Sequence, residues 1–422
     1  IYLTDDNPRS ENPKKIRNEI KRGIKNKNIQ EIPQRSRAIL KCIENLHSGD
    51  IAIVAGKGHE KTQDYKGQKK FFSDRKEILK SISIKNKSLF KDLRLNIIQE
   101  NTEILNKNMV FNKAVINSIK LKKNDIFFAI KGKKNDGNNF LKEVFKKKAS
   151  LAVVNKPNKK FPLSKQVKVK DTLKFLTECS TSYRDNIRGS IISITGSCGK
   201  TTLKEMIGNV MKKISNTSFS PMSYNNKYGV PLSLFNLKQN KKFGIFEVGM
   251  DKKGEIDYLT KILKPDLGII TNISYAHSKN FKSIKEIAEA KSEIIDNIKT
   301  DGTLLLNADD YFYEFHKKKA LKRNLKIFSF SIKNKEGYTK LIKIKNVNKK
   351  YEIFFKLGSE ISFFYSNNNS QSYIQNLLAT ITVLSLFFDV KKIPKDIFLD
   401  FKLPEGRGDI SKLKFKNKII NF

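Results

Sequence analysis

The sequence predicts an α/β protein of several domains, built on parallel β-sheets. Short apolar segments rich in Ile, Val and Phe recur along the chain, and segments with helical periodicity separate them. Glycine-containing loops follow several of these apolar segments, where α/β proteins place ligand-binding groups. The length of 422 residues also exceeds that of one ordinary domain.

Residues 1–88 are expected to form the first α/β domain. The segment "DIAIVAGKGHE" combines a continuous apolar run with a glycine-rich turn, which predicts a buried strand that enters a loop. The polar, Lys-rich segment "SIKNKSLFK" predicts a linker to the next domain. The expected elements of this domain are strands at Ile1–Thr4 and Asp50–Glu60 and helices at Pro13–Lys25 and Arg35–Leu46.

The α/β pattern begins again twice after this linker. Residues 89–185 contain "DIFFAIKGKKNDGNNF" and "ASLAVV", and residues 186–403 contain the strand-like runs "SIISIT", "FGIFEVG", "LGIITNIS" and "TLLLNADD". A β-rich stretch is expected near 326–366, and a buried helix over Leu377–Phe388. Residues 404–422 are expected to begin a further domain, so that the chain covers only part of it.

The net charge of +42 raises the question of a nucleic-acid partner. The lysines are scattered through the whole chain and are not gathered with aromatic residues on one element. We therefore interpret the charge as general surface use of Lys, and we expect no nucleic-acid partner.

Cysteine content and hydropathy predict a soluble cytoplasmic protein. Cys42, Cys179 and Cys198 show no paired spacing, which argues against a disulfide framework or a zinc site and fits a reducing compartment. No apolar run approaches the roughly 18 to 20 residues that span a bilayer.

The strongest local motif is "SITGSCGKTTLKEM". A β-branched strand enters a glycine loop and a helix follows, so backbone N–H groups and the helix N-terminus can surround a phosphate. Lys200 can reach the β- and γ-phosphates, and Thr201 can offer its hydroxyl to Mg²⁺. The loop is a shortened variant, because Ile194 stands where the strict motif has glycine. Its expected nucleotide-binding residues are Gly196, Ser197, Cys198, Gly199, Lys200, Thr201 and Thr202.

Three further candidates follow strands or lie on a helix of the same domain. Glu247 ends an apolar strand, where a metal-binding carboxylate would be placed. His277 follows "GIITNISYA", and the alternative for it is an ordinary surface or core histidine. Lys291 lies in the helical segment "SIKEIAEAKSEII" and is by itself no signal in so Lys-rich a chain.

These motifs, in this order, resemble the Mur ligases. The matching segments are "TGSCGKTTLKEM", "NNKYGVPLSL", "EVGMDKKGEI", "NISYAHSKNF", "AKSEI" and "LLLNADD". They are most similar to the family member that uses ATP to add D-alanyl-D-alanine to the UDP-N-acetylmuramoyl tripeptide. The segment "NSIKLKKNDIFFAIKGKKNDGNNF" resembles that enzyme's UDP-sugar domain, but Asn117, Ser118 and Ile119 replace its usual Asp-Ser-Arg.

The resemblance implies an acyl-phosphate mechanism with ATP and two Mg²⁺ ions. Thr201 and Glu247 would bind the first Mg²⁺, whereas His277 and a carbamylated Lys291 would bind the second. Ser118 would contact the UDP-sugar. The residues expected near the nucleotide are Asn226, Asn307, Asp309, Asn376 and, at the hinge to a third domain, Arg407.

The first residues resemble another part of the family, the C-terminal end of the ligase that adds meso-diaminopimelate. "DNPR" matches its recognition motif, "AGKGHE" its second contact and "FFSDRKEIL" its closing run. The substrate-binding residues implied are Asp6, Asn7, Pro8, Arg9, Gly56 and Glu60. The chain is therefore expected to be a window of a fusion of the two ligases, inactive by itself.

Three alternatives remain open at this stage. The chain could be a basic P-loop ATPase that acts on nucleic acid, which stimulation by DNA would reveal. Residues 1–88 could belong to a separate protein, joined artificially to the rest. A folate-type polyglutamate ligase shares the P-loop core, although "LKEM" and "NNKYGVP" argue against it.

Overall fold

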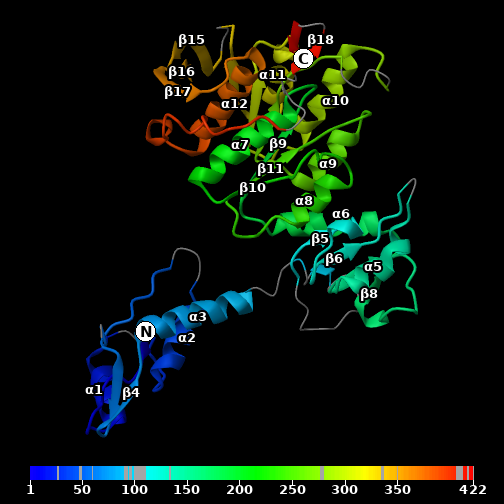
Figure 1. Ribbon diagram of the computed structural model, residues 1–422. Coiled ribbons are helices and arrows are strands. Elements are labelled where there is room, and N and C mark those ends of the chain that lie inside the picture. Colours follow the sequence, from blue (N-terminus) through cyan, green and yellow to red (C-terminus); the bar gives the residue numbers. More distant parts are fainter. Residues whose placement is uncertain are drawn as a thin grey trace. The chain divides into compact units, whose positions relative to one another are not determined.

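The computed structural model describes residues 1–422 apart from 26–27, 47–49, 59, 90–93, 95–96, 99–110, 133–134, 276–279, 334–336, 349, 405–411, 416–417 and 422. The chain divides into two compact units, Ile1–Asn96 and Ile97–Phe422 (Figure 1). The finer division predicted at residues 88, 185 and 403 stays a prediction.

The first unit combines helices with two small sheets. Among its described residues, β1 pairs in parallel with β2, and β3 pairs antiparallel with β4. The Asn12 side chain caps the first helix, which begins with Pro13 at a position where its missing N–H is not needed. The elements are β1 (Tyr2–Leu3), α1 (Pro13–Gly23), β2 (Gln30–Glu31), α2 (Arg35–Glu44), β3 (Thr62–Tyr65), β4 (Gln68–Phe71) and α3 (Asp74–Leu89).

Two predictions for this unit are wrong. The strand predicted to run into the glycine turn of 50–60 is not found in the described part of this segment: Ile51 and Ile53 are 87% and 86% exposed, and no described strand pairs with it. An apolar run becomes a stable strand only where a neighbour satisfies its backbone groups. The predicted linker at 83–91 is instead helical as far as Leu89, because it contains no Gly or Pro that would end α3.

The second unit begins with a parallel four-stranded sheet in the order β5-β6-β7-β8. The helices α5 and α6 follow β6 and β8, and a small apolar core that includes Phe127 and Leu141 lies beneath α5. The elements are β5 (Ala114–Val115), β6 (Ile126–Phe128), α5 (Leu141–Lys146), β7 (Leu151–Val154), β8 (Gln166–Lys168) and α6 (Thr172–Asp185).

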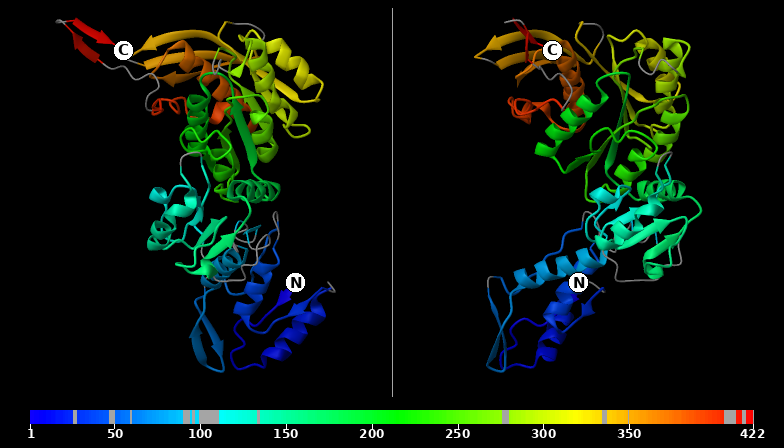
Figure 2. Two further views of the ribbon diagram at one scale, coloured as in Figure 1. Left: turned by 90° about the vertical axis from the view of Figure 1, so that its right-hand side faces the viewer. Right: turned by 45° about the vertical axis from the view of Figure 1, so that its right-hand side comes forward.

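A nine-stranded sheet forms the centre of the second unit, in the order β10-β11-β9-β12-β13-β14-β15-β16-β17 (Figure 2). The strands are parallel as far as β15, and the last three are antiparallel. The strands are β9 (Ser190–Thr195), β10 (Thr217–Phe219), β11 (Phe243–Glu247), β12 (Leu267–Ile270), β13 (Thr303–Asn307), β14 (Lys326–Ser331), β15 (Thr339–Val347), β16 (Lys350–Leu357) and β17 (Glu360–Ser366).

The order of the strands locates the binding edge of this sheet. From β9 the chain crosses to one side, to β10, and after β11 it crosses back past β9 to β12. Ligands of such sheets bind beyond the carboxyl ends of the strands at this reversal. The helices are α7 (Lys200–Ile214), α8 (Gly229–Phe235), α9 (Glu255–Leu263), α10 (Ile284–Asp296), α11 (Tyr313–Leu321) and α12 (Gln371–Phe387). A last hairpin consists of β18 (Lys412–Phe415) and β19 (Lys418–Asn421).

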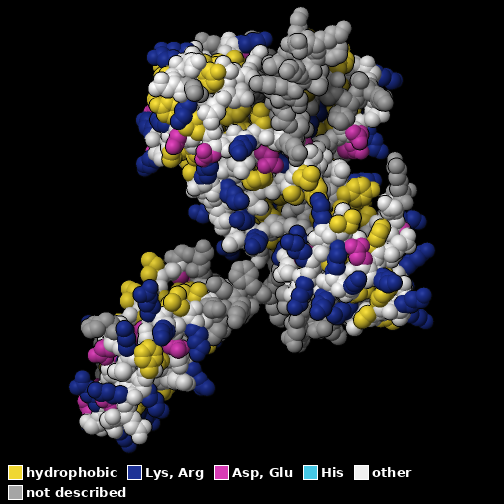
Figure 3. All heavy atoms as spheres, in the orientation of Figure 1, with side chains coloured by type: hydrophobic (Ala, Val, Ile, Leu, Met, Phe, Trp, Pro, Cys, Tyr) yellow, Lys and Arg dark blue, Asp and Glu magenta, His cyan; other side chains and the backbone are white. Residues whose placement is uncertain are grey.

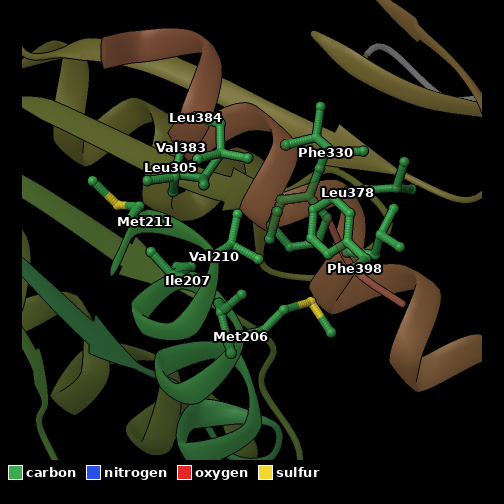
Figure 4. Packing of buried hydrophobic residues seen from close by; sticks show 14 of the residues in the cluster. Met206, Ile207, Val210, Met211, Leu305, Phe330, Leu378, Val383, Leu384 and Phe398 are labelled. Carbon is green, nitrogen blue, oxygen red and sulfur yellow. The ribbon is translucent and has the colours of Figure 1, made fainter. Parts of the chain in front are cut away.

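The main core lies between this sheet and the helices α7 and α12 (Figure 4). Met206, Ile207 and Val210 point from α7 toward Leu378 and other apolar residues of α12. The buried helix predicted over 377–388 is confirmed as the greater part of α12. This core fixes where α7 begins, and therefore where the glycine loop before it lies.

No helix in the described ranges is both long enough and apolar enough to cross a lipid bilayer.

Candidate active site

The glycine loop between β9 and α7 is tightly constrained. Gly196 and Gly199 have φ angles of +145° and +81°. A Cβ atom on Gly196 would lie 1.9 Å from Thr271 Oγ1, so this position requires glycine. The loop ends where α7 begins at Lys200, and the first N–H groups of the helix therefore face the loop, as at phosphate-binding sites.

The segment after β12 holds this loop in place. Thr271 Oγ1 donates to the Cys198 carbonyl at 2.7 Å, and the Cys198 N–H donates to Asn272 Oδ1 at 2.9 Å. Ser197 Oγ donates to the Ser274 carbonyl at 3.0 Å. Thr271 and Asn272 are not among the predicted site residues, although a polar pair directly after a buried strand was a usable signal.

Lys200 lies back over the loop that precedes it. Its Nζ donates to the Gly196 carbonyl at 2.8 Å and to the Ser197 carbonyl at 3.0 Å. The structure brings the whole predicted motif together as one loop and helix start: Gly196, Ser197, Cys198, Gly199, Lys200, Thr201 and Thr202.

Thr201 and Glu247, the two predicted ligands of the first Mg²⁺, contact each other beside the loop. Thr201 Oγ1 donates to Glu247 Oε2 at 2.7 Å, and Glu247 is 1% exposed at the end of β11. Asn225 Nδ2 donates to Glu247 Oε1 at 2.8 Å. Hydroxyl and carboxylate oxygens fit Mg²⁺, which prefers hard oxygen ligands. Asn225 was missed, because the prediction chose its neighbour Asn226.

Asn226 has a different role in this structure. Its Oδ1 accepts hydrogen bonds from the N–H groups of Tyr228 and Gly229 at 3.1 and 3.0 Å, which supports the start of α8. The expected contact of Asn226 with the nucleotide stays a prediction.

Lys291 is a buried lysine on α10, with an exposed fraction of 1%. Burial, and to a lesser extent the positive charge of Lys200, lower the pKa of its amine to about 7, against an opposing effect of Cys198. His277, its predicted partner, lies outside the described residues. Within the described ranges, no group of three or more His, Cys, Asp or Glu side chains could hold a metal ion.

The described positions predicted near the nucleoside lie at the end of β13, just after it, and on α12. Asn307 Oδ1 accepts from the Asp309 N–H at 3.0 Å, and Asp309 accepts from Ser331 Oγ at 2.7 Å, which ties β13 to β14. Asn376 borders the phosphate loop, since a Cβ on Gly199 would lie 3.3 Å from its Oδ1. Arg407 lies outside the described residues.

A cavity of about 340 Å³ separates β5 from the β10–α8 region. Ser220 Oγ and Ser233 Oγ are buried in its lining and have no hydrogen-bond partner among the described atoms. Ser118, predicted to contact the sugar nucleotide, donates to Glu143 Oε2 at 2.7 Å and does not line the cavity. The lining includes Lys113, Asn117, Lys120, Met222, Tyr224 and Asn236.

In the first unit, most of the predicted contacts gather around two loops. Asn7 Nδ2 donates to Glu60 Oε2 at 2.5 Å, across 53 residues of sequence. A Cβ on Gly56, whose φ is +109°, would lie 3.2 Å from Asp6 Oδ2. Lys57, which was missed, is buried, with its Nζ 3.7 Å from Asp6 Oδ1 and 3.8 Å from Glu60 Oε2.

Pro8 and Arg9 continue this loop to one side. They line a separate cavity of about 250 Å³ together with Tyr65. Arg9 is exposed and has a φ of +50°. The hydrogen bond that its backbone N–H donates to the Asp64 carbonyl, at 3.0 Å, supports this conformation.

Comparison with known proteins identifies the central domain. Residues 194–384 match the family model "Mur ligase middle domain". The chain is 36% identical over 228 residues to the UDP-N-acetylmuramoyl-tripeptide–D-alanyl-D-alanine ligase of Buchnera aphidicola subsp. Acyrthosiphon pisum, covering 54% of this chain and 49% of that one. The ligase of the same name from Buchnera aphidicola subsp. Baizongia pistaciae is 34% identical over 299 residues, covering 70% and 64%. The chain thus spans between about half and two thirds of the length of these relatives.

Solved structures agree with this assignment of the fold. MurF from Acinetobacter baumannii superposes with a TM-score of 0.65 at 26% identity, over 75% of this chain and 69% of that one. MurF from Thermotoga maritima in complex with ADP superposes with a TM-score of 0.62 at 23% identity, which supports the fold. The predicted multidomain α/β architecture with parallel sheets is confirmed.

Proposed function

We propose that this chain is an ATP-dependent ligase of peptidoglycan precursor synthesis from the Mur ligase family, because residues 194–384 match the model of that family's middle domain. The substrates would be UDP-N-acetylmuramoyl-tripeptide and D-alanyl-D-alanine, as in the names of its relatives. Such precursors are made in the cytoplasm, where we place the protein. The observation that carries the proposal is the contact between Thr201 and Glu247 beside the glycine loop.

The proposed reaction has two balanced steps. A carboxylate oxygen of the tripeptide attacks the γ-phosphorus of ATP, so that an acyl phosphate forms and ADP leaves. The amine of D-alanyl-D-alanine then attacks the acyl carbon, and phosphate leaves as the amine loses a proton. Catalysis depends on positioning and on charge stabilisation at the phosphate.

The residues of the loop have defined roles in this proposal. Lys200, whose ammonium donates to the loop carbonyls, would exchange these bonds for stronger, charge-assisted bonds to the β- and γ-phosphates. Thr201 and Glu247 would hold Mg²⁺, whose positive charge would lower the barrier to phosphoryl transfer. Asn225 orients the Glu247 carboxylate from the other side.

We infer a second metal position at Lys291 and His277. An ammonium cannot bind a cation, but a carbamate formed from CO₂ and a neutral amine provides an anionic oxygen. The lowered pKa of Lys291 supports this inference, because an amine with a pKa of about 7 is substantially neutral near pH 7.

We propose that the 340 Å³ cavity takes part of the sugar nucleotide. Two buried hydroxyls without partners, Ser220 and Ser233, suit a polar ligand, because buried polar groups are normally hydrogen-bonded. Lys113 and Lys120 in its lining can face an anionic diphosphate.

For the first unit we propose that it derives from the ligase that adds meso-diaminopimelate. The observation in favour is the bond between Asn7 and Glu60, which joins two predicted contact loops. Glu60 would pair with the distal ammonium of the amino acid, and the exposed Arg9 fork with its distal carboxylate. Lysine lacks that carboxylate.

We therefore expect the chain to bind meso-diaminopimelate roughly tenfold better than lysine. The Arg9→Ala variant should lose this preference. Equal binding of both amino acids by the wild type would contradict the assignment.

The main proposal is tested by ligand binding to the full chain. We expect calorimetric titration to detect ATP with Mg²⁺ and, separately, UDP-N-acetylmuramoyl-tripeptide. UDP-glucose, which has the same diphosphate but no lactyl peptide, is the matched control ligand. Binding of ATP without any preference for the muramoyl peptide would support only a nucleotide-binding protein.

A further inference from the structure

Lys204 is a fully buried charge to which the proposed chemistry gives no role. Lys204 lies on α7, one turn after Lys200, and its exposed fraction is 0%. Its Nζ donates to the Ser220 carbonyl at 2.7 Å and to the Met222 carbonyl at 2.5 Å, and it pairs with Glu205 Oε1 at 3.0 Å. A buried ammonium is costly unless it is paired and hydrogen-bonded, and here both conditions are met.

The two carbonyls belong to the segment that lines the cavity. Ser220 and Met222 directly follow β10 and form part of the cavity wall. The hydroxyl of Ser220 is one of the two buried hydroxyls without a partner in that wall. The ammonium of Lys204 therefore holds the backbone of a wall residue whose buried hydroxyl has no partner among the described atoms.

The backbone of this segment is strained. Met222 has a φ of +48°, in the left-handed region that a residue with a side chain rarely adopts. Its side chain is 67% exposed, so packing of the side chain does not account for the conformation. The hydrogen bond that Lys204 donates to the Met222 carbonyl accounts for this conformation, because the bond exists only while that carbonyl points back toward α7.

We propose that Lys204 is a positioning residue that connects the phosphate-loop helix to the cavity. It holds residues 220–222 in the shape that the cavity ligand requires, and it touches neither ATP nor that ligand. The identity of the ligand, a nucleoside diphosphate sugar, rests on the proposed function. The geometry of the connection rests only on the contacts of Lys204.

Lys204→Met keeps the length and volume of the side chain and removes its hydrogen-bond donors. We expect the full chain with this substitution to bind UDP-N-acetylmuramoyl-tripeptide about 10- to 100-fold more weakly, the loss typical of hydrogen bonds to a charged group. The affinity for ATP with Mg²⁺ should stay within about threefold, because the contacts of Lys200 are unchanged. Lys204→Gln, which keeps an amide donor group, should give a smaller loss of affinity for the same ligand.

Two further variants separate positioning from general stability. Lys213→Met is the matched control on the same helix, since Lys213 donates to the Ile397 carbonyl and to Asp400, away from the cavity. Met222→Gly in the Lys204→Met background should restore part of the lost affinity, because glycine adopts the left-handed conformation without strain.

Hydrogen exchange provides a readout that needs no ligand. In the Lys204→Met variant, peptides that cover residues 217–224 should exchange faster, whereas those from the middle of α7 should remain protected. If the wild type does not bind the muramoyl peptide, the proposed substrate is wrong, and this exchange pattern still decides the role of Lys204. Equal losses for both ligands with uniformly faster exchange, or no loss at all, would overturn the proposal.

Discussion

Buried polar side chains of the candidate site satisfy the hydrogen-bonding groups of one another. Glu247 is almost fully buried and accepts from both Thr201 and Asn225, so its carboxylate has one orientation. Preorganised polar groups of this kind favour catalysis because they need not rearrange when charge develops on the substrate. Substitutions at these positions should therefore change function more than they change folding.

Lys200→Ala should abolish high-affinity ATP binding without unfolding the chain. The side chain is only partly buried, and its hydrogen bonds go to its own loop rather than to the core. We expect the dissociation constant for ATP with Mg²⁺ to rise at least about tenfold, or 1.4 kcal/mol, in a calorimetric titration. Lys212→Ala, which removes an exposed lysine from the same helix, is the control. Unchanged ATP affinity in the Lys200 variant would refute the phosphate-loop assignment.

The amine of Lys291 should react with CO₂ as the pH rises through neutrality. Its pKa of about 7 means that the folded chain loses this proton between about pH 6 and 8, where an ordinary lysine remains charged. In ¹³C-bicarbonate, a carbamate NMR signal should grow over this interval and be absent from Lys291→Arg. A signal of equal size in that variant would assign the carbamate to another residue.

At the scale of elements, neighbouring helices hold the site through few but buried contacts. The helix α10, which carries Lys291, packs against α11, and His316 of α11 places its Nε2 3.2 Å from the Ala288 carbonyl. The ring must carry its proton on Nε2 to make this bond. A second proton would give the buried ring a positive charge, which burial disfavours. The contact therefore depends on pH.

His316 should make the second unit lose stability as the pH falls from about 6.5 to about 4. Burial lowers its pKa to about 4, so in this interval the unfolded chain binds a proton that the folded chain does not. The free energy of unfolding should fall by an amount on the order of 3 kcal/mol across it. Urea unfolding at several pH values should show a smaller decrease for His316→Gln, which keeps an N–H donor and does not titrate. Lys318→Gln, an exposed change on the same helix, should behave like the wild type.

At the scale of the whole molecule, the candidate site belongs to one unit. The contacts described for the phosphate loop, for Lys291 and for the cavity all join residues of Ile97–Phe422. The residues predicted to contact meso-diaminopimelate all lie in Ile1–Asn96. The two sets of binding groups thus belong to different units of the chain.

A chain that lacks residues 1–96 should therefore retain ATP binding. We expect its dissociation constant for ATP with Mg²⁺ to stay within about threefold of the full chain. Circular dichroism of the shortened chain must first show a cooperative thermal transition. A cooperative, folded fragment without ATP affinity would show that the first unit contributes to the nucleotide site.

Nucleic acid should not stimulate ATP hydrolysis by this chain. Lys and Arg side chains spread over the visible face of both units and do not form one basic stripe (Figure 3). We expect DNA to bind weakly and with a steep dependence on salt, as nonspecific contact with phosphates does, and the rate of ATP hydrolysis to stay constant. Strong stimulation at physiological salt would favour the alternative of a nucleic-acid-dependent ATPase.

Local sequence pattern was enough to predict the phosphate loop and the parallel α/β core. The motif from Gly196 to Thr202 needs consecutive residues only, and the strands β9, β11, β12 and β13 are apolar runs that local pattern describes well. The same local reasoning failed at 50–60, because an apolar run forms a strand only beside a partner that local sequence does not specify.

Which distant side chains complete the site could be learned only from the way the chain packs in three dimensions. Asn225 rather than Asn226 contacts Glu247, because the turn that starts α8 uses the amide of Asn226 for its own backbone. Lys204 resembles every other lysine of a Lys-rich chain in the sequence, and it differs from them only in being enclosed between α7 and the segment after β10. The pKa of Lys291 and the role of Lys204 depend on burial and on the direction of the side chain. Both arise from long-range packing, so they cannot be predicted from spacing along the chain.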